Sequence, residues 1–364
     1  MHKLKILFLP NWRVKRLIKD EPEIPSPNKI LSPNSYWFFR YWRGFNFEVD
    51  VLDNYSPVPI NILEKKIKFS ILQSIRAFFL QNKYDIIISH GSTSSIFFLF
   101  LNSVFRINHK PFLLIDIGCF NRARENKFEL FLIKIAAKSI DFIIYHSSIQ
   151  QKWYEKNLPF LSNKTKFIPF GVDEDEFKPQ KLNRKAKFIL SFGEPGRGRD
   201  YKTLLKSWEN ISHNDYKLII IGPARCEELG YLNLPMDVEL KGLFNIAELK
   251  EYIINSDFVV LPLPYYKHSY GQMSFLQSMS CGKAVVITKT PSTVDYFPKD
   301  YELFVAPKDP SDLARKIKYS MEHPAEIERI GIDFRKRIID EFNEKKMAND
   351  IYSILKGIVD GRNN

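Results

Sequence analysis

The chain has 364 residues, 45% of them apolar and 26% charged, which is the balance of a soluble globular protein with room for two cores. Its three cysteines lie far apart in the sequence, which excludes a disulfide framework and a cysteine-cluster zinc site. The net charge is +12, and residues 1–170 carry the whole surplus, with 25 of the 54 Lys and Arg but only 13 of the 42 Asp and Glu.

The apolar runs are too short for a signal peptide or a membrane span. The N-terminal run stops at Pro10, and the longest run, residues 96–101, is far below the ~20 residues that cross a bilayer. We therefore predict a cytoplasmic protein. The basic first half would attract anionic lipid or nucleic acid, but no DNA- or RNA-reading module is present, so nucleic acid is not an expected partner.

In the first half, short apolar runs alternate with helix-length amphipathic stretches. This alternation predicts parallel strands joined by helices. The expected strands are 4–9, 47–52, 84–89, 111–116 and 141–146, and the expected helices lie near 62–82 and 124–139.

Three polar residues end strands of this half. His90 precedes a Gly/Ser loop, Asp116 ends the following strand, and His146 ends a further one. Ligands of open α/β sheets bind beyond the carboxyl ends of the strands. His90 and Asp116 are therefore candidates to orient or deprotonate an acceptor hydroxyl, and the alternative for both is capping of nearby backbone. For His146 the capping interpretation leads.

A cluster of aromatic residues marks the first half. Residues 36–47 hold eight aromatic side chains and two arginines, and the segment that begins at Trp12 mixes apolar with basic residues. Trp, Tyr and basic side chains suit a bilayer interface, whereas packing between strand and helix is the equal alternative. Together with the segregated charge, the cluster predicts peripheral contact with an anionic membrane, on the inner face of the cell membrane.

The pattern breaks at residues 171–185, which are polar and contain Pro179. A new series of apolar runs then begins. We predict an N-terminal Rossmann-like domain over 1–170, a linker over 171–186, a second Rossmann-like domain over 187–342, and a C-terminal helix over 343–364 that packs back on the first domain.

The second half repeats the strand–helix alternation and ends in two helices with no strand between them. Nearly all-apolar runs such as 217–221 suit strands that are covered on both faces. The expected strands are 187–192, 216–222, 238–241, 257–261, 284–288 and 303–306, and the expected helices are 200–212, 246–255, 271–281 and 310–321.

The loop after the strand 187–192 contains three glycines within six residues, followed by the start of a helix near Asp200. Gly193 allows close backbone approach, and Arg197 and Arg199 stand just before the helix. A helix N-terminus with two guanidinium groups is a good site for a diphosphate. The alternative is a solvated turn with two surface arginines.

Two further loops follow strand ends. After the strand 257–261, a polar and aromatic loop leads into a helix whose first backbone N–H groups face the ligand edge of the sheet. We expect diphosphate binding by Gly271, Gln272 and Met273, and contacts to the donor sugar or ribose by Ser269, Tyr270 and Gln277. After 238–241, the residues Gly242, Leu243 and Phe244 could form a slot for a nucleobase.

The order of these pieces resembles the family 4 glycosyltransferases of the GT-B fold. The resemblance covers about residues 167–306 and rests on six segments. They are FIPFGVD from Phe167, SFG from Ser191 with RDYKTLL from Arg199, LIIIG from Leu218, LKG from Leu240, DFVVLP from Asp257, and GQ at Gly271 with QSMSCGKAVV from Gln277. The first half resembles the family only in layout.

The resemblance implies two Rossmann-like domains that face each other across a cleft, the second binding a nucleoside diphosphate sugar and the first an acceptor. It gives Arg199, with Arg197, the diphosphate. Family members usually carry two glutamates eight residues apart, where this chain has Ser269 and Gln277. Many relatives also carry a histidine where Asp116 stands. An amide can still bond ribose hydroxyls through its carbonyl oxygen.

The function expected is transfer of a sugar from a UDP- or GDP-sugar to a hydroxyl of a sugar or lipid-linked glycan, retaining by resemblance. Assembly of a surface polysaccharide, a lipopolysaccharide or another glycolipid is the expected setting. No metal and no cofactor are expected, because arginines would carry the diphosphate charge. The alternatives are a nucleotide-sugar epimerase of the same fold and a non-catalytic sugar-nucleotide-binding protein.

Overall fold

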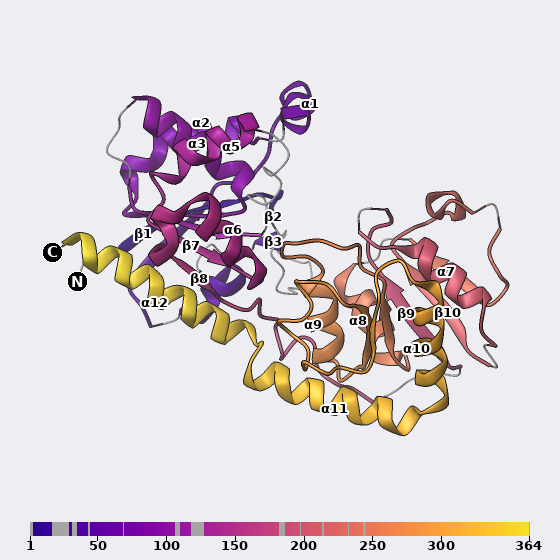
Figure 1. The fold of residues 1–364 in the computed structure, drawn as a ribbon. Helices are drawn as coiled ribbons and strands as arrows, with labels where there is room; N and C mark the ends of the chain where they lie inside the picture. Colours follow the sequence, from indigo (N-terminus) through magenta and orange to yellow (C-terminus); the bar gives the residue numbers. More distant parts are fainter. Residues whose placement is uncertain are drawn as a thin grey trace. The chain divides into compact units, whose positions relative to one another are not determined.

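A computed structural model gives the fold of the chain (Figure 1). It describes residues 3–16, 29–30, 35–42, 44–67, 69–105, 110–117, 127–181, 186–196, 198–212, 215–231, 233–242 and 245–363. These residues divide into two compact units. Unit 1 comprises Met1–Pro169, Lys267–Ser269 and Met347–Asn364, and unit 2 comprises Phe170–Tyr266 and Tyr270–Lys346.

Unit 1 is a parallel six-stranded sheet flanked by helices. The strand order is β4-β1-β5-β6-β7-β8, and each neighbouring pair is parallel. The strands are β1 (Leu4–Pro10), β4 (Phe47–Val51), β5 (Ile86–His90), β6 (Phe112–Asp116), β7 (Phe142–Tyr145) and β8 (Thr165–Phe167), with a separate short pair β2 (Lys15–Arg16) and β3 (Lys29–Ile30). The α-helices are α1 (Val58–Ile67), α2 (Ile71–Leu80), α3 (Ser92–Phe105), α5 (Lys127–Ala137) and α6 (Ile149–Asn157), and the 3-10 helices are η2 (Trp37–Trp42), η3 (Gln81–Lys83) and η4 (Pro159–Lys164).

The aromatic cluster of residues 36–47 is mostly core. Trp37, Phe38 and Phe39 on η2 are buried and contact Phe8 of β1 edge-on. Trp42, also buried, packs edge-on against Phe38 and Phe39. Of the two alternatives for this segment, the structure therefore shows packing between strand and helix. Arg43 lies outside the described residues.

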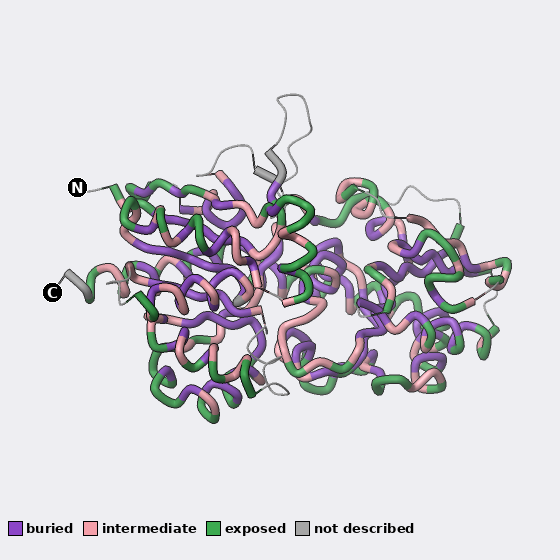
Figure 2. Tube along the Cα trace, turned by 90° about the horizontal axis from the view of Figure 1, so that it is seen from above, coloured by how far each residue is buried: buried purple, intermediate pink, exposed green. Residues whose placement is uncertain are grey.

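Unit 2 is a second parallel six-stranded sheet, in the order β11-β10-β9-β12-β13-β14. Its strands are buried along most of their length (Figure 2). They are β9 (Phe188–Phe192), β10 (Lys217–Ile221), β11 (Val238–Lys241), β12 (Val259–Leu261), β13 (Val285–Thr288) and β14 (Phe304–Val305). The helices are α7 (Tyr201–Glu209), η5 (Cys226–Leu229), α8 (Ile246–Asn255), α9 (Gln272–Ser280), α10 (Pro310–Glu322) and α11 (Pro324–Asp340). The predicted α/β fold with parallel sheets is confirmed.

The polar segment expected as a linker is anchored to unit 2. Val172 forms a β-bridge with Asn343, Phe177 is buried in the core of this unit, and Arg335 donates to the carbonyls of Glu174 and Phe177. Asp173 accepts from the backbone N–H groups of the turn that follows it. The segment therefore follows the surface of unit 2 as a fixed strap.

The last helix, α12 (Glu344–Asn363), continues the chain into unit 1 from Met347 onward. Ala348, Ile351 and Leu355 are buried, and the indole Nε1 of Trp42 donates to the carbonyl of Ala348 at 2.8 Å. Tyr352 stacks on Phe45 with ring centroids 3.8 Å apart. Within the described residues, no helix is both long and apolar enough to cross a bilayer.

Candidate functional site

The loop after β9 is shaped by glycines. Gly193 and Gly222 have φ angles of +130° and +134°. A Cβ at Gly222 would lie 2.2 Å from the carbonyl oxygen of Gly193, and one at Gly193 would lie 2.8 Å from Cζ of Arg199. These positions bring the ends of β9 and β10 together and leave space for one large side chain, that of Arg199.

Polar contacts hold this loop against the end of β12. The Asp200 N–H donates to the carbonyl of Pro262 at 2.8 Å, and the Tyr201 hydroxyl donates to the carbonyl of Gly193 at 2.8 Å. Asp200 also caps α7 by accepting from the Thr203 N–H at 3.2 Å and from its hydroxyl at 2.7 Å. The N-terminus of α7 and the two loops thus form one rigid edge.

Arg199 is the buried cation of this edge, with 4% of its surface exposed. Its Nη1 donates to the carbonyl of Gly198 at 2.7 Å, and its Nη2 donates to Oγ of Ser274 at 2.6 Å. Its Nε–H has no hydrogen-bond partner, and no carboxylate pairs with it, in the part of the chain that the structure describes. Burial lowers the pKa of the guanidinium, yet arginine stays protonated in proteins. An anion would complete this site.

Helix α9 starts beside Arg199. Its N-cap is Gly271 with φ +82°, and Ser274 of the first turn holds the guanidinium. Among the described side chains, Nε2 of the buried Gln272 has no hydrogen-bond partner, and Met273 is exposed. Tyr270 lies beside Arg199, and burial raises the pKa of its phenol, so the hydroxyl stays neutral next to the guanidinium. The first turn of α9 therefore offers backbone N–H groups next to a buried cation.

The remaining donor-side residues are placed as follows. Gln277 is buried on α9, while Ser269 belongs to unit 1 and Tyr270 to unit 2. Gly242 follows β11, and a Cβ there would lie 3.7 Å from Cβ of Ala224. The predictions for Arg197, Leu243 and Phe244 fall outside the described residues. No group of three His, Cys, Asp or Glu side chains suited to a metal ion occurs among the described residues.

In unit 1, His90 ends β5 inside an aromatic enclosure. Its ring lies 4.8 Å from that of Trp12, 5.0 Å from that of Trp37 and 6.3 Å from that of His146, measured between centroids. The ring is buried, and neither nitrogen bonds to another described residue. Burial, with a smaller contribution from His146, holds the pKa of His90 well below its usual range, so the imidazole is neutral at pH 7.

Trp37 and His146 complete this enclosure. Trp37 has φ +42°, which is strained for a bulky residue and occurs where the surrounding structure enforces it. His146 Nδ1 pairs with the carbonyl of Ile168 at 2.7 Å, and burial lowers the pKa of His146 to about 4. His146 thus bonds to backbone, as its capping interpretation expected.

Asp116 ends β6 and is fully buried. Its Oδ2 accepts from the hydroxyl of Tyr154 and from Nε2 of Gln150, the latter at 2.9 Å. Burial, then the negative charge of Asp116, raises the pKa of Tyr154 well above its usual range, so the phenol remains a donor. This carboxylate joins α6 to β6, and the sequence offered no signal for Gln150 and Tyr154 as its partners.

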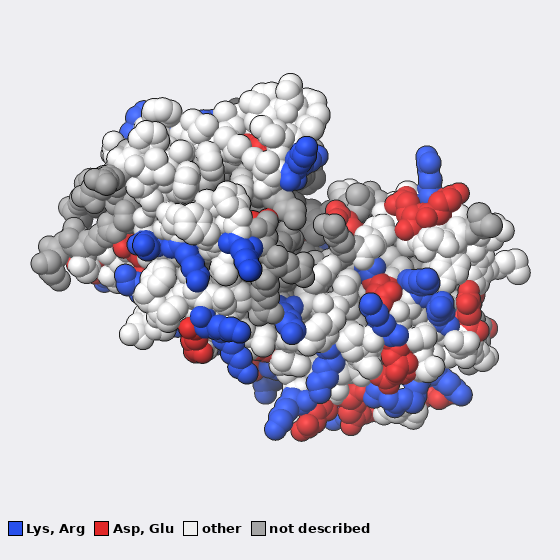
Figure 3. Space-filling view, turned by 45° about the horizontal axis from the view of Figure 1, so that its top comes forward, with Lys and Arg blue, Asp and Glu red and all other residues white. Residues whose placement is uncertain are grey.

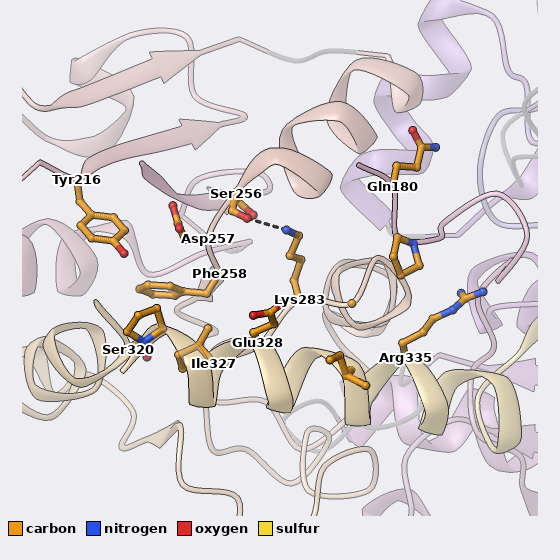
Figure 4. A pocket seen from close by; sticks show the side chains of 14 residues that line it. Gln180, Tyr216, Ser256, Asp257, Phe258, Lys283, Ser320, Ile327, Glu328 and Arg335 are labelled. Atoms are coloured by element: carbon orange, nitrogen blue, oxygen red, sulfur yellow. Dashed lines mark hydrogen bonds between the residues drawn. The ribbon is translucent and has the colours of Figure 1, made fainter. Parts of the chain in front are cut away.

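Unit 2 also has a hollow at the opposite, amino-terminal edge of its sheet, with a volume of about 530 Å³ (Figure 4). Lys283 reaches across it to donate to the carbonyl of Ser256 at 2.8 Å. Arg335 lines it and donates to backbone carbonyls of the strap. The hollow contains none of the predicted donor residues.

Comparison with known proteins gives one family match. Residues 172–341 match the model described as glycosyl transferases group 1. No curated protein sequence matches the chain.

Many solved structures share the fold. Similar structures include a glycosyltransferase from Rickettsia africae (17% identity, TM-score 0.72, covering 99% of each chain). Sucrose-phosphate synthase from Thermosynechococcus elongatus is 16% identical, with TM-score 0.70 over 98% of this chain and 100% of that one. Anabaena HepE in complex with UDP is 14% identical, with TM-score 0.70 over 97% of this chain and 100% of that one. A further HepE structure is a complex with UDP-glucose.

Proposed function

We propose that this glycosyltransferase, whose residues 172–341 match the group 1 glycosyl transferases, transfers a sugar from a UDP- or GDP-sugar to a hydroxyl of a sugar or lipid-linked glycan. The family match favours transfer over the epimerase and binding-only alternatives. A retaining outcome, a role in surface polysaccharide or glycolipid assembly, and peripheral contact with a membrane belong to the same proposal. UDP in the similar HepE structure makes UDP-sugars the first donors to test.

The observation that carries the proposal is the buried and unpaired charge of Arg199. A desolvated guanidinium without a carboxylate is costly, and a diphosphate supplies two negative charges at bidentate spacing. Arg199 lies between the loop after β9 and the first turn of α9, so Gly271, Gln272 and Met273 would present backbone N–H groups to the same anion. Gly193, whose N–H donates to the carbonyl of Ile221 at 2.9 Å, would instead let the anion approach the loop closely.

In the reaction, the site would stabilise the negative charge that develops on the departing diphosphate. As the bond between the sugar and the phosphate oxygen breaks, negative charge grows on the diphosphate while the anomeric carbon becomes oxocarbenium-like. Preorganised donors such as Arg199 and the α9 N-terminus stabilise that charge without reorganisation. No metal is needed for this step in our proposal.

On the acceptor side, His90 remains the candidate for a direct role. Its neutral imidazole has an unbonded nitrogen that can accept a hydroxyl proton in a hydrogen bond. Its lowered pKa makes it a weak base, which favours orienting the hydroxyl over removing its proton. The strain at Trp37, whose ring contacts His90, supports a functional purpose for this enclosure. For Asp116 we propose an indirect role, because Tyr154 and Gln150 already occupy its oxygen.

The test is donor turnover in the presence of acceptors. The protein is incubated with UDP- and GDP-sugars and an extract of membrane glycolipids, and product and free nucleotide are measured together. Nucleotide release that depends on the acceptor supports transfer, and the anomeric configuration of the product, read by NMR, decides between retention and inversion. Binding of nucleotide without turnover on any acceptor would contradict the proposal.

A further inference from the structure

Helices α2, α3 and α5 of unit 1 bear an unusual concentration of exposed phenylalanines. Phe79 is 76% exposed, Phe105 63%, Phe128 66% and Phe131 58%. Helix α3 packs against both α2 and α5, so the three helices form one layer on the sheet. Figure 1 shows this layer beside α1, which exposes Val58 and Ile62 as well. We call the outer surface of α1, α2, α3 and α5 the phenylalanine face.

From Ile96 onward, helix α3 is apolar on both its inner and its outer side, apart from Asn102 and Ser103. None of its 14 residues is charged. Its inner side chains, such as Phe98 and Leu99, are fully buried, whereas Phe97, Phe100 and Leu101 on the other side are only half-buried. A helix that is apolar all round is normally covered on all sides or bound to lipid. The outer side of α3 therefore extends the phenylalanine face between α2 and α5.

The charges on this face are of one sign. Five exposed basic residues lie on its helices, namely Lys65, Lys66, Arg76, Lys127 and Lys134. The only acidic residues of the same helices are Glu64, which is buried, and Glu129, which is half-buried. Figure 3 shows a broad pale area on this part of unit 1, with little Asp or Glu colour and with Lys and Arg at its margins.

We propose that the phenylalanine face docks on an anionic membrane surface, with its aromatic side chains in the headgroup region and its basic side chains on lipid phosphates. Aromatic and basic side chains in this mixture suit the bilayer interface. Charge complementarity decides for lipid over a second copy of the chain, since two such faces would repel each other. This proposal rests on the proposed function. A lipid-linked acceptor lies in the membrane, so docking on the membrane would bring the enzyme to its acceptor.

The face differs from the one that the sequence indicated. Four of the aromatic residues of η2 are core, while Phe79 of α2, Phe105 of α3 and Phe128 and Phe131 of α5 are exposed. The proposal therefore rests on the exposed phenylalanines and the basic residues of the phenylalanine face, and the η2 segment is not part of it.

Vesicle co-sedimentation of the full chain tests the proposal. We expect the protein to pellet with phosphatidylcholine vesicles that contain phosphatidylglycerol, and to be released when salt rises from about 0.1 to 1 M. The double variant Phe79→Ser/Phe131→Ser should lower vesicle affinity roughly tenfold or more, because each ring loses its apolar contact. Arg76→Gln/Lys134→Gln should weaken binding to the anionic vesicles alone.

Phe160→Ser is the matched control, since Phe160 is also about half exposed but lies on η4. It should bind vesicles like the wild type. The proposal is overturned if the wild type does not pellet, if pure phosphatidylcholine binds it equally, or if the phenylalanine variants match the control. A dimer in gel filtration that Phe79→Ser dissolves would assign the face to a second copy instead. Calorimetric titration with UDP measures the affinity of the donor site independently of vesicle binding. The membrane proposal and the proposed function can therefore fail separately.

Discussion

At the scale of the residue, Arg199 should have opposite effects on ligand binding and on the stability of the free protein. A buried guanidinium without a carboxylate partner costs solvation free energy that its hydrogen bonds to Gly198 and Ser274 offset in part and that a bound anion would offset further. A residue whose charge is compensated by a bound ligand should stabilise the complex and lower the free energy of unfolding of the free protein.

We therefore expect Arg199→Met to weaken UDP binding roughly a hundredfold, about 3 kcal/mol, which is the upper range for a charged hydrogen bond. The free protein should be unchanged in stability or more stable, by up to about 4 kcal/mol. Calorimetry with UDP and denaturant unfolding measure the two effects. Arg315→Met, at an exposed arginine of α10, is the control, and equal UDP affinity in both variants would refute the role of Arg199.

His90 and His146 predict how stability depends on pH. The folded-state pKa of both is lowered by burial, that of His146 to about 4, whereas unfolded histidine titrates near 6.5. Below about pH 6.5 the unfolded chain binds protons that the folded chain does not, so the free energy of unfolding falls as pH drops.

For each buried histidine we expect a loss of up to about 1.4 kcal/mol per pH unit below 6.5. In urea unfolding measured between about pH 7 and 5, His90→Phe should remove the contribution of His90 to this dependence of the free energy of unfolding on pH. Phe160→Ser, which removes no titratable group, should leave the slope unchanged. An identical slope in wild type and His90→Phe would show that His90 takes up its proton in the folded protein.

At the scale of the element, helix and strand positions follow from local periodicity, whereas their interruptions depend on distant contacts. The helices expected at 246–255 and 310–321 are found at Ile246–Asn255 and Pro310–Glu322. The single helix expected at 62–82 is two helices, α1 and α2, where the Ser70 N–H donates to the carbonyl of Thr93 and Glu64 accepts from the N–H of Leu72. The short edge strand β8 has only three residues and gave no recognisable pattern.

Gly222 follows strand β10 and packs against Gly193, in the loop that leads to Arg199. Gly222→Ala should destabilise the protein by more than about 1 kcal/mol, because the φ of +134° excludes a side chain and the Cβ would overlap the carbonyl of Gly193. The same displacement should weaken UDP binding through Arg199. Gly357→Ala, inside α12 with open space around the new methyl group, should instead stabilise by about 0.4–1 kcal/mol. Thermal unfolding and UDP titration of both variants check these signs, and a neutral Gly222→Ala would exclude the steric argument.

At the scale of the whole molecule, α12 belongs to unit 1 although unit 2 precedes it in the chain. Its buried residues and the Trp42 hydrogen bond tie unit 1 to the C-terminus. Residues that follow unit 2 in the sequence therefore complete the core of unit 1.

Removing residues 347–364 should destabilise unit 1 by several kcal/mol, because three buried aliphatic side chains and one buried hydrogen bond are lost. Hydrogen exchange should show faster opening of β1 and β4 while β9 and β12 stay protected, and UDP should still bind unit 2. Trp42→Phe, which removes the hydrogen bond and part of the buried ring but keeps α12, should show a smaller loss of about 1–3 kcal/mol. Equal protection of β1 with and without these residues would contradict the assignment.

The sequence alone determined the two series of parallel strands, which the structure confirmed, and the glycosyltransferase resemblance, which the family match confirmed. It also located the loop of Gly193 and Arg199, whose role stays a prediction. Such features depend on backbone geometry within a few residues. Tertiary structure decided which aromatic residues are core and which are exposed, and that Tyr154 and Gln150 hold Asp116. The Trp42 indole bonds a residue 306 positions away, and burial arises from such distant contacts, which local patterns do not encode.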